Sequence, residues 1–115
     1  MNSGNLIMDL TFQFSLDRVV FTEVLEEKRK YVLAKQLFKS GTSIGANVRE
    51  AQSGESKNDF IHKLKIFAKE AEETEYWLLL CKHSPLLPNP GKLLNDIGSI
   101  KRVIGKIIST SKNGK

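Results

Sequence analysis

Residues 36–60 read Q-L-F-K-S-G-T-S-I-G-A-N-V-R-E-A-Q-S-G-E-S-K-N-D-F. The apolar residues of this stretch recur at helical spacing, yet small and polar residues crowd positions 41–45, and Asn47 falls where an apolar residue is expected. Each glycine inside a helix lowers its stability by roughly 1 kcal/mol relative to alanine. A helix that carries both Gly41 and Gly45 therefore indicates a site where a second helix approaches closely.

Length and composition predict a single globular domain over residues 1–115, with 40% apolar and 27% charged residues. No apolar run approaches the roughly 20 residues of a membrane-spanning helix. Residues 1–10 contain Asp9 and no basic cluster before an apolar core, so we do not expect a secretion signal there. Cys81 is the only cysteine, which excludes a disulfide within the chain and makes a reducing cytoplasm the expected compartment.

The net charge of +5 is concentrated at the end of the chain. Residues 1–91 are balanced, whereas residues 92–115 hold six lysines and arginines against Asp96 alone. This excess is consistent with an electrostatic surface for nucleic acid. It is also consistent with a solvated helix face whose late lysines favour the negative end of the helix dipole.

Hydrophobic periodicity predicts helices at about residues 11–27, 30–52, 56–84 and 90–110, after a frayed leader at residues 1–10. Ser56 is expected to cap the third helix, and Asn89 with Pro90 to begin the fourth. No strand-like alternation occurs. Four helices with short connections predict an all-α, antiparallel up-down four-helix bundle.

The expected core faces follow from steps of three and four residues. The predicted face of the first helix consists of Phe12, Leu16, Val19, Val20, Val24 and Leu25. The predicted seam of the second consists of Leu33, Leu37, Ser40, Ile44, Asn47 and Ala51. The third carries Phe60, Leu64, Phe67, Ala71, Thr74, Leu78 and Cys81, and the fourth Leu93, Ile97, Ile100, Ile104, Ile107 and Ile108.

Catalytic and metal-binding motifs are lacking, so we predict a non-enzymatic protein without metal or cofactor. A di-metal bundle needs Glu-x-x-His on two helices, and the chain offers only Asp59-x-x-His62. Cys81 lies on an apolar seam, where a buried thiol is inert. His62 and His83 stand in no recognisable motif, and the glycines of residues 36–60 do not follow a strand as in a phosphate loop.

Polar residues on the second helix and Trp77 on the third invite more than one interpretation. Gln36, Ser40 and Asn47 could make a satisfied polar contact within the subunit, a subunit contact or a ligand contact. Trp77 lies off the main seam and indicates either a second interface or partial burial within the subunit.

Three motifs follow one another along the chain: Q-L-x-x-S-x-T-S-I-G-A-N-V-x-E-A (residues 36–51), S-K-x-D-F-I-x-K (56–63) and E-A-x-E-T-x-Y-W-L (70–78). In these motifs the chain resembles a bacterial four-helix-bundle family related to the 23S rRNA intervening-sequence proteins. The best-matching positions are Gln36, Ser40, Ser43, Ile44, Asn47, Glu50, Asp59, Phe60, Glu70, Glu73 and Trp77. Ala51 stands where longer members have glycine, so the chain is similar to the shorter branch.

The resemblance implies a homopentamer of four-helix bundles arranged as a barrel. Similar proteins, the accessory proteins of diversity-generating retroelements, bind nucleic acid and a reverse transcriptase through a basic surface. The family offers no established catalytic residue.

Two hypotheses about function follow. The first is an oligomeric accessory factor that binds structured RNA or DNA through a basic surface. The residues expected to form this surface are Lys101, Arg102, Lys106 and Lys112. A nucleic-acid enzyme is a further partner under this hypothesis. The alternative is a structural or adaptor oligomer with a protein partner and no nucleic acid; no membrane partner is expected. In either case a polar signature is assigned to assembly, and it consists of Gln36, Ser40, Ser43, Asn47, Glu50, Glu70, Glu73 and Trp77.

Overall fold

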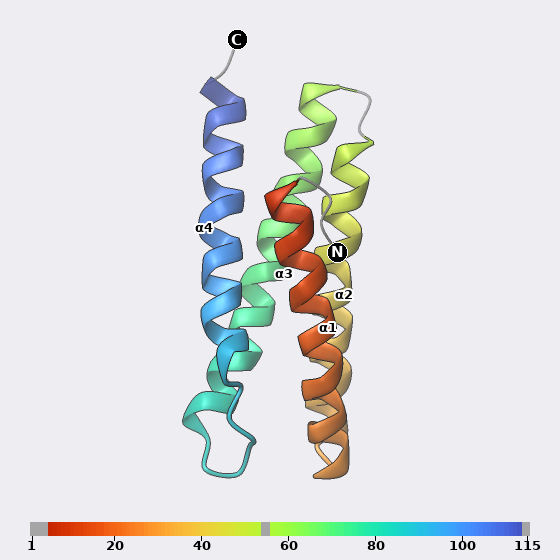
Figure 1. The fold of residues 1–115 in the computed structure, drawn as a ribbon, viewed down its shortest axis with the longest axis vertical. Coiled ribbons are helices and arrows are strands. Elements are labelled where there is room, and N and C mark those ends of the chain that lie inside the picture. The colour runs from red at the N-terminus through yellow and green to blue at the C-terminus, as the bar shows by residue number, and fades with distance from the viewer. Residues whose placement is uncertain (1–4, 54–55, 114–115) are drawn as a thin grey trace.

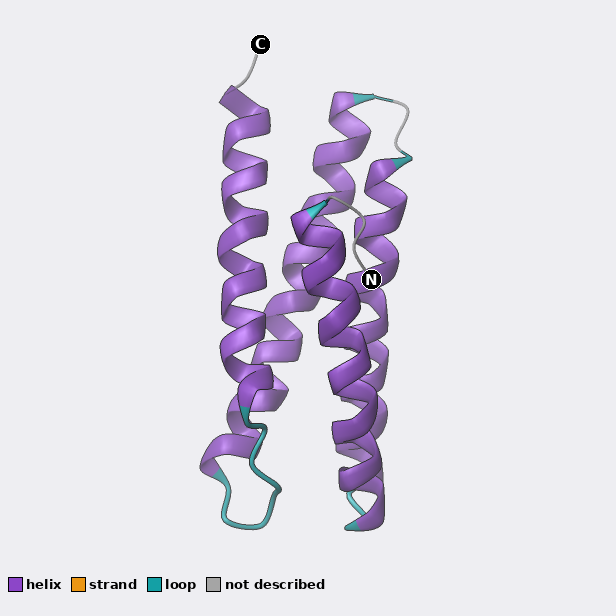
Figure 2. Ribbon diagram, in the orientation of Figure 1, coloured by secondary structure: helices purple, strands orange, loops and turns teal. Residues whose placement is uncertain are grey.

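The computed structural model describes residues 5–53 and 56–113, and over these residues it contains four α-helices and no strand (Figures 1 and 2). The helices are α1 (Leu6–Glu27), α2 (Tyr31–Gln52), α3 (Lys57–His83) and α4 (Lys92–Asn113). Consecutive helices run in opposite directions along a body that measures 49 × 24 × 21 Å. None of the four is apolar enough over a sufficient length to span a membrane.

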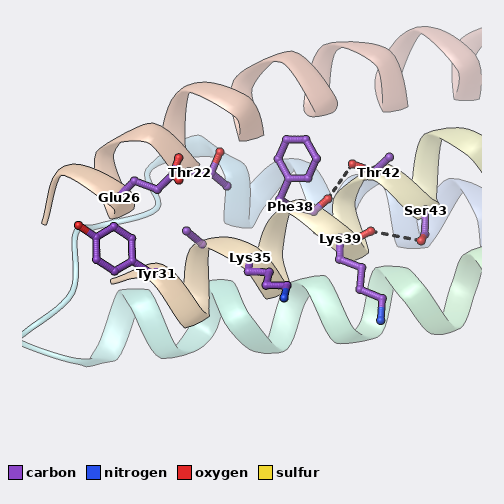
Figure 3. A pocket seen from close by; sticks show the side chains of 9 residues that line it. Thr22, Glu26, Tyr31, Lys35, Phe38, Lys39, Thr42 and Ser43 are labelled. Atoms are coloured by element: carbon purple, nitrogen blue, oxygen red, sulfur yellow. Dashed lines mark hydrogen bonds between the residues drawn. The ribbon is translucent and has the colours of Figure 1, made fainter. Parts of the chain in front are cut away.

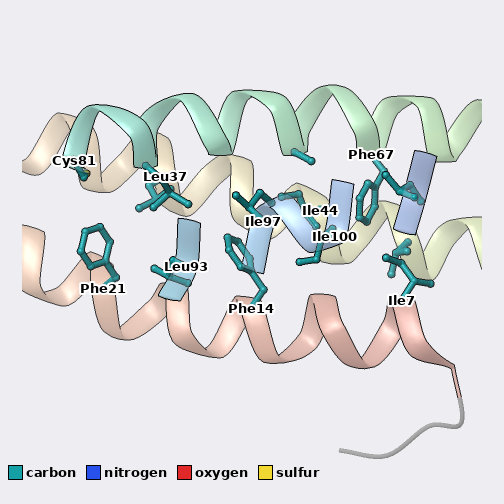
Figure 4. Close-up of a cluster of buried hydrophobic side chains, with 14 of the residues drawn as sticks. Ile7, Phe14, Phe21, Leu37, Ile44, Phe67, Cys81, Leu93, Ile97 and Ile100 are labelled. Atoms are coloured by element: carbon teal, nitrogen blue, oxygen red, sulfur yellow. The ribbon is translucent and has the colours of Figure 1, made fainter. Parts of the chain in front are cut away.

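The helices pack as a ring in chain order. α2 contacts α1 and α3, and α4 contacts α3 and α1, with the α2–α3 pair the most extensive and the α1–α4 pair the least. All four contribute to one buried apolar cluster between them (Figure 4). The predicted all-α fold of four helices is therefore confirmed.

α1 begins earlier than predicted. Asn5 caps the helix because its side-chain oxygen accepts a hydrogen bond from the Met8 amide at 3.2 Å. Ile7, in the predicted frayed leader, is buried at the end of the core. The prediction was wrong for residues 6–10 because the cap at Asn5 was overlooked; residues 1–4 lie outside the part of the chain that the structure describes.

The core face of α1 also differs from the predicted one. Leu25 is buried as predicted, but Phe12, Leu16, Val19 and Val20 are exposed. The helix carries two stripes with three- and four-residue spacing, and burial follows the one that includes polar residues. The buried residues are Ile7, Thr11, Phe14, Arg18, Phe21, Thr22 and Leu25. α1 therefore leaves apolar surface in water.

The seam of α2 is largely as predicted, with one shift. Leu37, Ser40, Ile44 and Ala51 are buried, but Val48 occupies the core where Asn47 was expected. Ser40 joins α2 to α3, because its Oγ accepts a hydrogen bond from the Thr74 hydroxyl at 2.9 Å in the buried interior.

α3 and α4 show the predicted apolar faces, but α4 differs at both ends. The Ser56 hydroxyl caps α3 by accepting from the Asp59 amide at 3.0 Å, as predicted. α4 begins at Lys92 instead of residue 90, because Gly91 adopts φ +58° and donates its amide to the Asn89 side chain at 2.7 Å. The helix then continues to Asn113, beyond the predicted end at residue 110.

Gly41 explains part of the unusual composition of α2. A Cβ at this position would lie 2.6 Å from Nε of Arg18 on α1, and 3.0 and 3.3 Å from its Cδ and Cγ. Gly45 is different, because its Cβ would meet only the Ser15 hydroxyl at 3.5 Å. One of the two glycines therefore permits the expected close approach, and it does so to admit a buried arginine.

We predict that Gly41→Ala lowers the free energy of unfolding by about 1–3 kcal/mol, because the added methyl group displaces the stem of Arg18. Gly45→Ala, the matched control, raises it by up to about 1 kcal/mol through helix propensity alone. Urea unfolding at one fixed protein concentration measures both changes. In an Arg18→Ala background, Gly41→Ala becomes neutral or stabilising; a loss that persists there contradicts the steric explanation.

Candidate functional site

α4 presents its cations to solvent because its apolar face is fixed in the core. Leu93, Ile97, Ile100 and Ile104 are buried, and the opposite face is polar. Of the predicted nucleic-acid ligands, Arg102, Lys106 and Lys112 are exposed. The remaining residues of this outer face are small and without negative charge, and they are Asn95, Gly98, Ser99, Gly105 and Ser109.

Lys101 is placed differently from the other three cations. Its Nζ lies 2.7 Å from a Glu72 carboxylate oxygen and 2.8 Å from one of Glu75, both on α3. The hydrogen bonds that Lys101 donates to Glu72 and then to Glu75 raise its pKa above the ordinary value. The ammonium group thus joins α4 to α3 and is already balanced by two carboxylates, so Lys101 is not a free phosphate ligand.

Lys92 is compensated in a similar way. Its Nζ lies 2.9 Å from Asp17 on α1 and 3.9 Å from Asp96 on its own helix. The hydrogen bond that Lys92 donates to Asp17 raises the pKa of Lys92. The excess charge of α4 therefore resides in Arg102, Lys106 and Lys112.

Two shallow depressions lie on either side of Lys101 along the α3–α4 groove. One, of about 300 Å³, is bordered by Gly98 and Arg102, and the other, of about 240 Å³, by Gly105 and Lys69. Arg102 donates to the Ser99 hydroxyl at 3.1 Å. Because Gly98 and Gly105 have no side chains, a phosphate backbone can approach the neighbouring cations closely.

The polar residues of α2 satisfy much of their hydrogen bonding within the subunit. Ser43 donates to the Lys39 carbonyl at 3.2 Å, and the Asn47 amide donates to the Ser43 carbonyl at 2.9 Å. Ser40 is buried and Gln36 is half-buried. For Ser40 and Asn47, this geometry agrees with a polar contact inside the subunit.

The acidic members of the predicted signature do not form one cluster. Glu50 lies 3.9 Å from Lys63 across the α2–α3 pair, with the Glu50 side chain exposed and the Lys63 side chain half-buried. Glu70 is half-buried, and its carbonyl lies 2.8 Å from the Thr74 hydroxyl. Glu73 points outward from α3, where it is exposed and makes no ion pair among the described residues.

Trp77 is half-buried and packs against the apolar core. Its ring meets the ring of Tyr76 edge to face, with 5.4 Å between centroids and 66° between planes. Its indole Nε1 is covered, and no acceptor lies within reach among the described residues. Tyr76 is the more exposed of the two aromatic rings, at 55%.

A groove between α1 and α2 was not predicted from the sequence. Its volume is about 770 Å³, and Tyr31, Lys35, Phe38 and Lys39 project into it from α2 (Figure 3). The remaining lining residues are Thr22, Glu26, Ala34, Thr42 and Ser43. This groove combines exposed aromatic rings with two lysines.

Arg18 lies beside this groove and is 3% exposed. Phe38 covers it, with the guanidinium carbon 4.4 Å from the ring centroid, and Nη2 donates to the Thr42 hydroxyl at 3.1 Å. Nε and Nη1 are buried without an acceptor, and burial lowers the pKa of the guanidinium. In the sequence, the sign of this site is Arg18 itself, which stands at helical spacing among the residues that α1 buries.

The described residues contain no group of three His, Cys, Asp or Glu side chains arranged to hold a metal ion. Cys81 is buried as predicted, and burial raises the pKa of its thiol to about 11. At neutral pH this thiol is protonated.

Comparison with known proteins identifies a family and a closely similar solved structure. The sequence model of the family described as 23S rRNA-intervening sequence protein matches residues 5–106. A crystal structure from Bacteroides thetaiotaomicron VPI-5482, of a protein with unknown function from the S23 ribosomal protein family, shares 39% identity with a TM-score of 0.84. The match covers 90% of this chain and 99% of that one. Among curated proteins, none matches.

We predict that Lys101→Met lowers the free energy of unfolding by about 1 kcal/mol or less, because Glu72 and Glu75 lose their shared cation. Lys106→Met, which removes an exposed lysine one turn away, leaves stability unchanged. Because folding raises the pKa of Lys101, its contribution is present at neutral pH and is lost as the pH rises through that pKa, above 10.5. Equal effects of the two substitutions in urea unfolding would contradict the ion-pair assignment.

Proposed function

Because the chain belongs to the family of 23S rRNA-intervening sequence proteins, we propose that it is a non-enzymatic, oligomeric helical bundle that binds structured RNA or DNA. The surface that binds is the outer face of α4. The observation that carries the proposal is that Arg102, Lys106 and Lys112 are exposed on a helix whose other two cations are neutralised.

Charge and shape both favour a phosphate backbone as the ligand. The outer face of α4 presents arginine and lysine between small residues, so several phosphates can lie close to it. Such contacts release counterions, which makes the affinity strongly dependent on salt. An assembly of subunits that each carry +5 multiplies this attraction. Recognition by charge and shape suits folded RNA as well as duplex DNA.

Exposed apolar side chains support assembly into an oligomer. They lie on α1, α2 and α3, and in the loop after α3, and among the described residues α4 exposes none. The set consists of Leu6, Phe12, Leu16, Val19, Val20, Tyr31, Val32, Phe38, Tyr76, Leu79, Leu80 and Leu86. A single subunit would leave all of them in water, which is unusual for a monomer. The family resemblance favours a homopentamer.

An adaptor with a protein partner is the second candidate function. Tyr76, Leu79 and Leu80 give α3 an exposed apolar surface that a partner protein could cover as readily as another subunit. This candidate predicts an oligomer that carries no nucleic acid. The ratio of absorbance at 260 and 280 nm on freshly purified protein distinguishes the two, since bound nucleic acid raises it.

We predict that the chain binds structured RNA or DNA with an affinity that falls steeply as salt rises. The triple variant Arg102→Gln, Lys106→Gln, Lys112→Gln lowers the slope of log affinity against log salt by up to about three for each subunit in contact. The measurement is fluorescence anisotropy across a salt series.

The matched control is Lys28→Gln, Lys65→Gln, Lys82→Gln, which removes the same charge from exposed positions outside α4. This control keeps most of the affinity. An equal loss in both triple variants would show that only net charge matters and would remove α4 as the binding surface. Absence of micromolar binding at low salt would overturn the proposal altogether.

A further inference from the structure

Arg18 is a buried cation between α1 and α2. We propose that Arg18 and the groove beside it receive the outer face of α3 from a second copy of this chain, with Glu73 of that copy as the carboxylate partner of Arg18. This inference rests on the oligomer put forward above and identifies which surfaces join its subunits.

Within one subunit, Arg18 lacks acceptors for two of its guanidinium nitrogen atoms. Its guanidinium has two buried nitrogen atoms, Nε and Nη1, without an acceptor, and no described carboxylate pairs with it. A buried cation without an anion is strongly unfavourable unless a partner is supplied. The chain nevertheless holds this arginine in place, with Gly41 leaving space for its stem and Thr42 fixing one nitrogen. The missing acceptor therefore belongs to something that binds here.

Phe38 lies on the guanidinium of Arg18, yet Phe38 itself is 51% exposed at the groove (Figure 3). The proposed contact requires the Phe38 ring to move aside so that a carboxylate reaches the guanidinium. An assembled interface also covers the ring, which removes its apolar surface from water.

The groove favours an acidic occupant. Lys35 and Lys39 line it, against the single carboxylate of Glu26. Tyr31 and Phe38 add aromatic surface at the same place, and both rings are more than half exposed. An occupant that matches this groove carries one or more carboxylates together with apolar side chains.

The outer face of α3 has this chemistry. Glu73, Tyr76 and Leu80 follow one another at steps of three and four residues, so they lie on one side of the helix, opposite the buried seam. All three are exposed, and the Glu73 carboxylate has no ion pair among the described residues. Trp77, beside them, keeps a covered Nε1 without an acceptor. A helix face that carries an acid together with aromatic and aliphatic residues fits a basic, aromatic groove.

The two surfaces belong to different parts of the bundle. The groove lies between α1 and α2, whereas the outer face of α3 points away from the core on its own helix. A contact between them joins unlike surfaces, and repeated contacts of this kind close into a ring when the rotation between subunits closes. The arrangement also leaves the outer face of α4 open to solvent.

Charge reversal tests the pairing at exposed positions. Glu73→Lys and Lys39→Glu are each expected to weaken self-association at least about tenfold, and Glu73→Lys has a much smaller effect in an Arg18→Met background, where no buried cation opposes it. Glu27→Gln, an exposed carboxylate at the end of α1, serves as the control and changes nothing. Sedimentation velocity over a concentration series, with circular dichroism to verify folding, measures each variant. An undiminished loss from Glu73→Lys in the Arg18→Met background overturns the pairing.

Arg18→Met gives a second, opposite signature. It fills the same space without a buried charge, so the dissociated subunit becomes more resistant to urea while self-association weakens at least about tenfold. Weaker association without the gain in subunit stability would mean that Arg18 acts only through packing, and would overturn its role as an unpaired cation.

Anisotropy with RNA on the same variants separates this inference from the proposed function. If the wild-type protein assembles but Glu73→Lys and Lys39→Glu leave its mass unchanged, the pairing is wrong and the oligomer stands. If Lys39→Glu abolishes RNA binding without changing the mass, the groove belongs to nucleic acid and the inference fails. If RNA binding is absent while the charge reversal behaves as expected, only the proposed function fails.

Discussion

The packing of Arg18 against Gly41 is the constraint on which the α1–α2 pair depends. The stem of the arginine occupies the space that any larger side chain at position 41 would fill. Its guanidinium then contacts the Phe38 ring and donates a hydrogen bond to Thr42, so two further residues of α2 accommodate the arginine. This accounts for a glycine in mid-helix, and it places a positive charge under the surface beside the groove of about 770 Å³.

The fold follows from the sequence wherever a helix carries one unambiguous stripe. α3 and α4 place strictly spaced Leu, Ile and Phe residues on a single face, and those residues are buried as predicted except Phe60, Ile107 and Ile108, which are partly buried against the core. α1 offers two stripes of similar spacing, and the one with more apolar residues stays outside. Periodicity within one helix cannot choose between them, because the choice depends on which face the other three helices leave room for.

The candidate site was only partly predictable for a related reason. The excess of positive charge after residue 91 is plain in the sequence, and the exposure of Arg102 and Lys106 follows from the apolar face of α4. The neutralisation of Lys101 does not, because Glu72 and Glu75 lie on another helix and reach it only in the packed bundle. In the packed bundle Glu72 and Glu75 pair with Lys101, whereas Glu73 points outward.

The division of exposed chemistry among the helices carries the functional argument furthest. Among the described residues, the exposed large apolar side chains lie on α1, α2, α3 and the loop after α3, while the uncompensated cations of the fourth helix stand on a face of small polar residues. Burial of apolar area drives association, whereas phosphate binding needs hydrated, accessible cations. Because the two requirements fall on different helices, the proposed assembly leaves free the surface proposed for nucleic acid. In the proposed oligomer each added subunit brings another copy of α4, which multiplies the weak contacts proposed for nucleic acid.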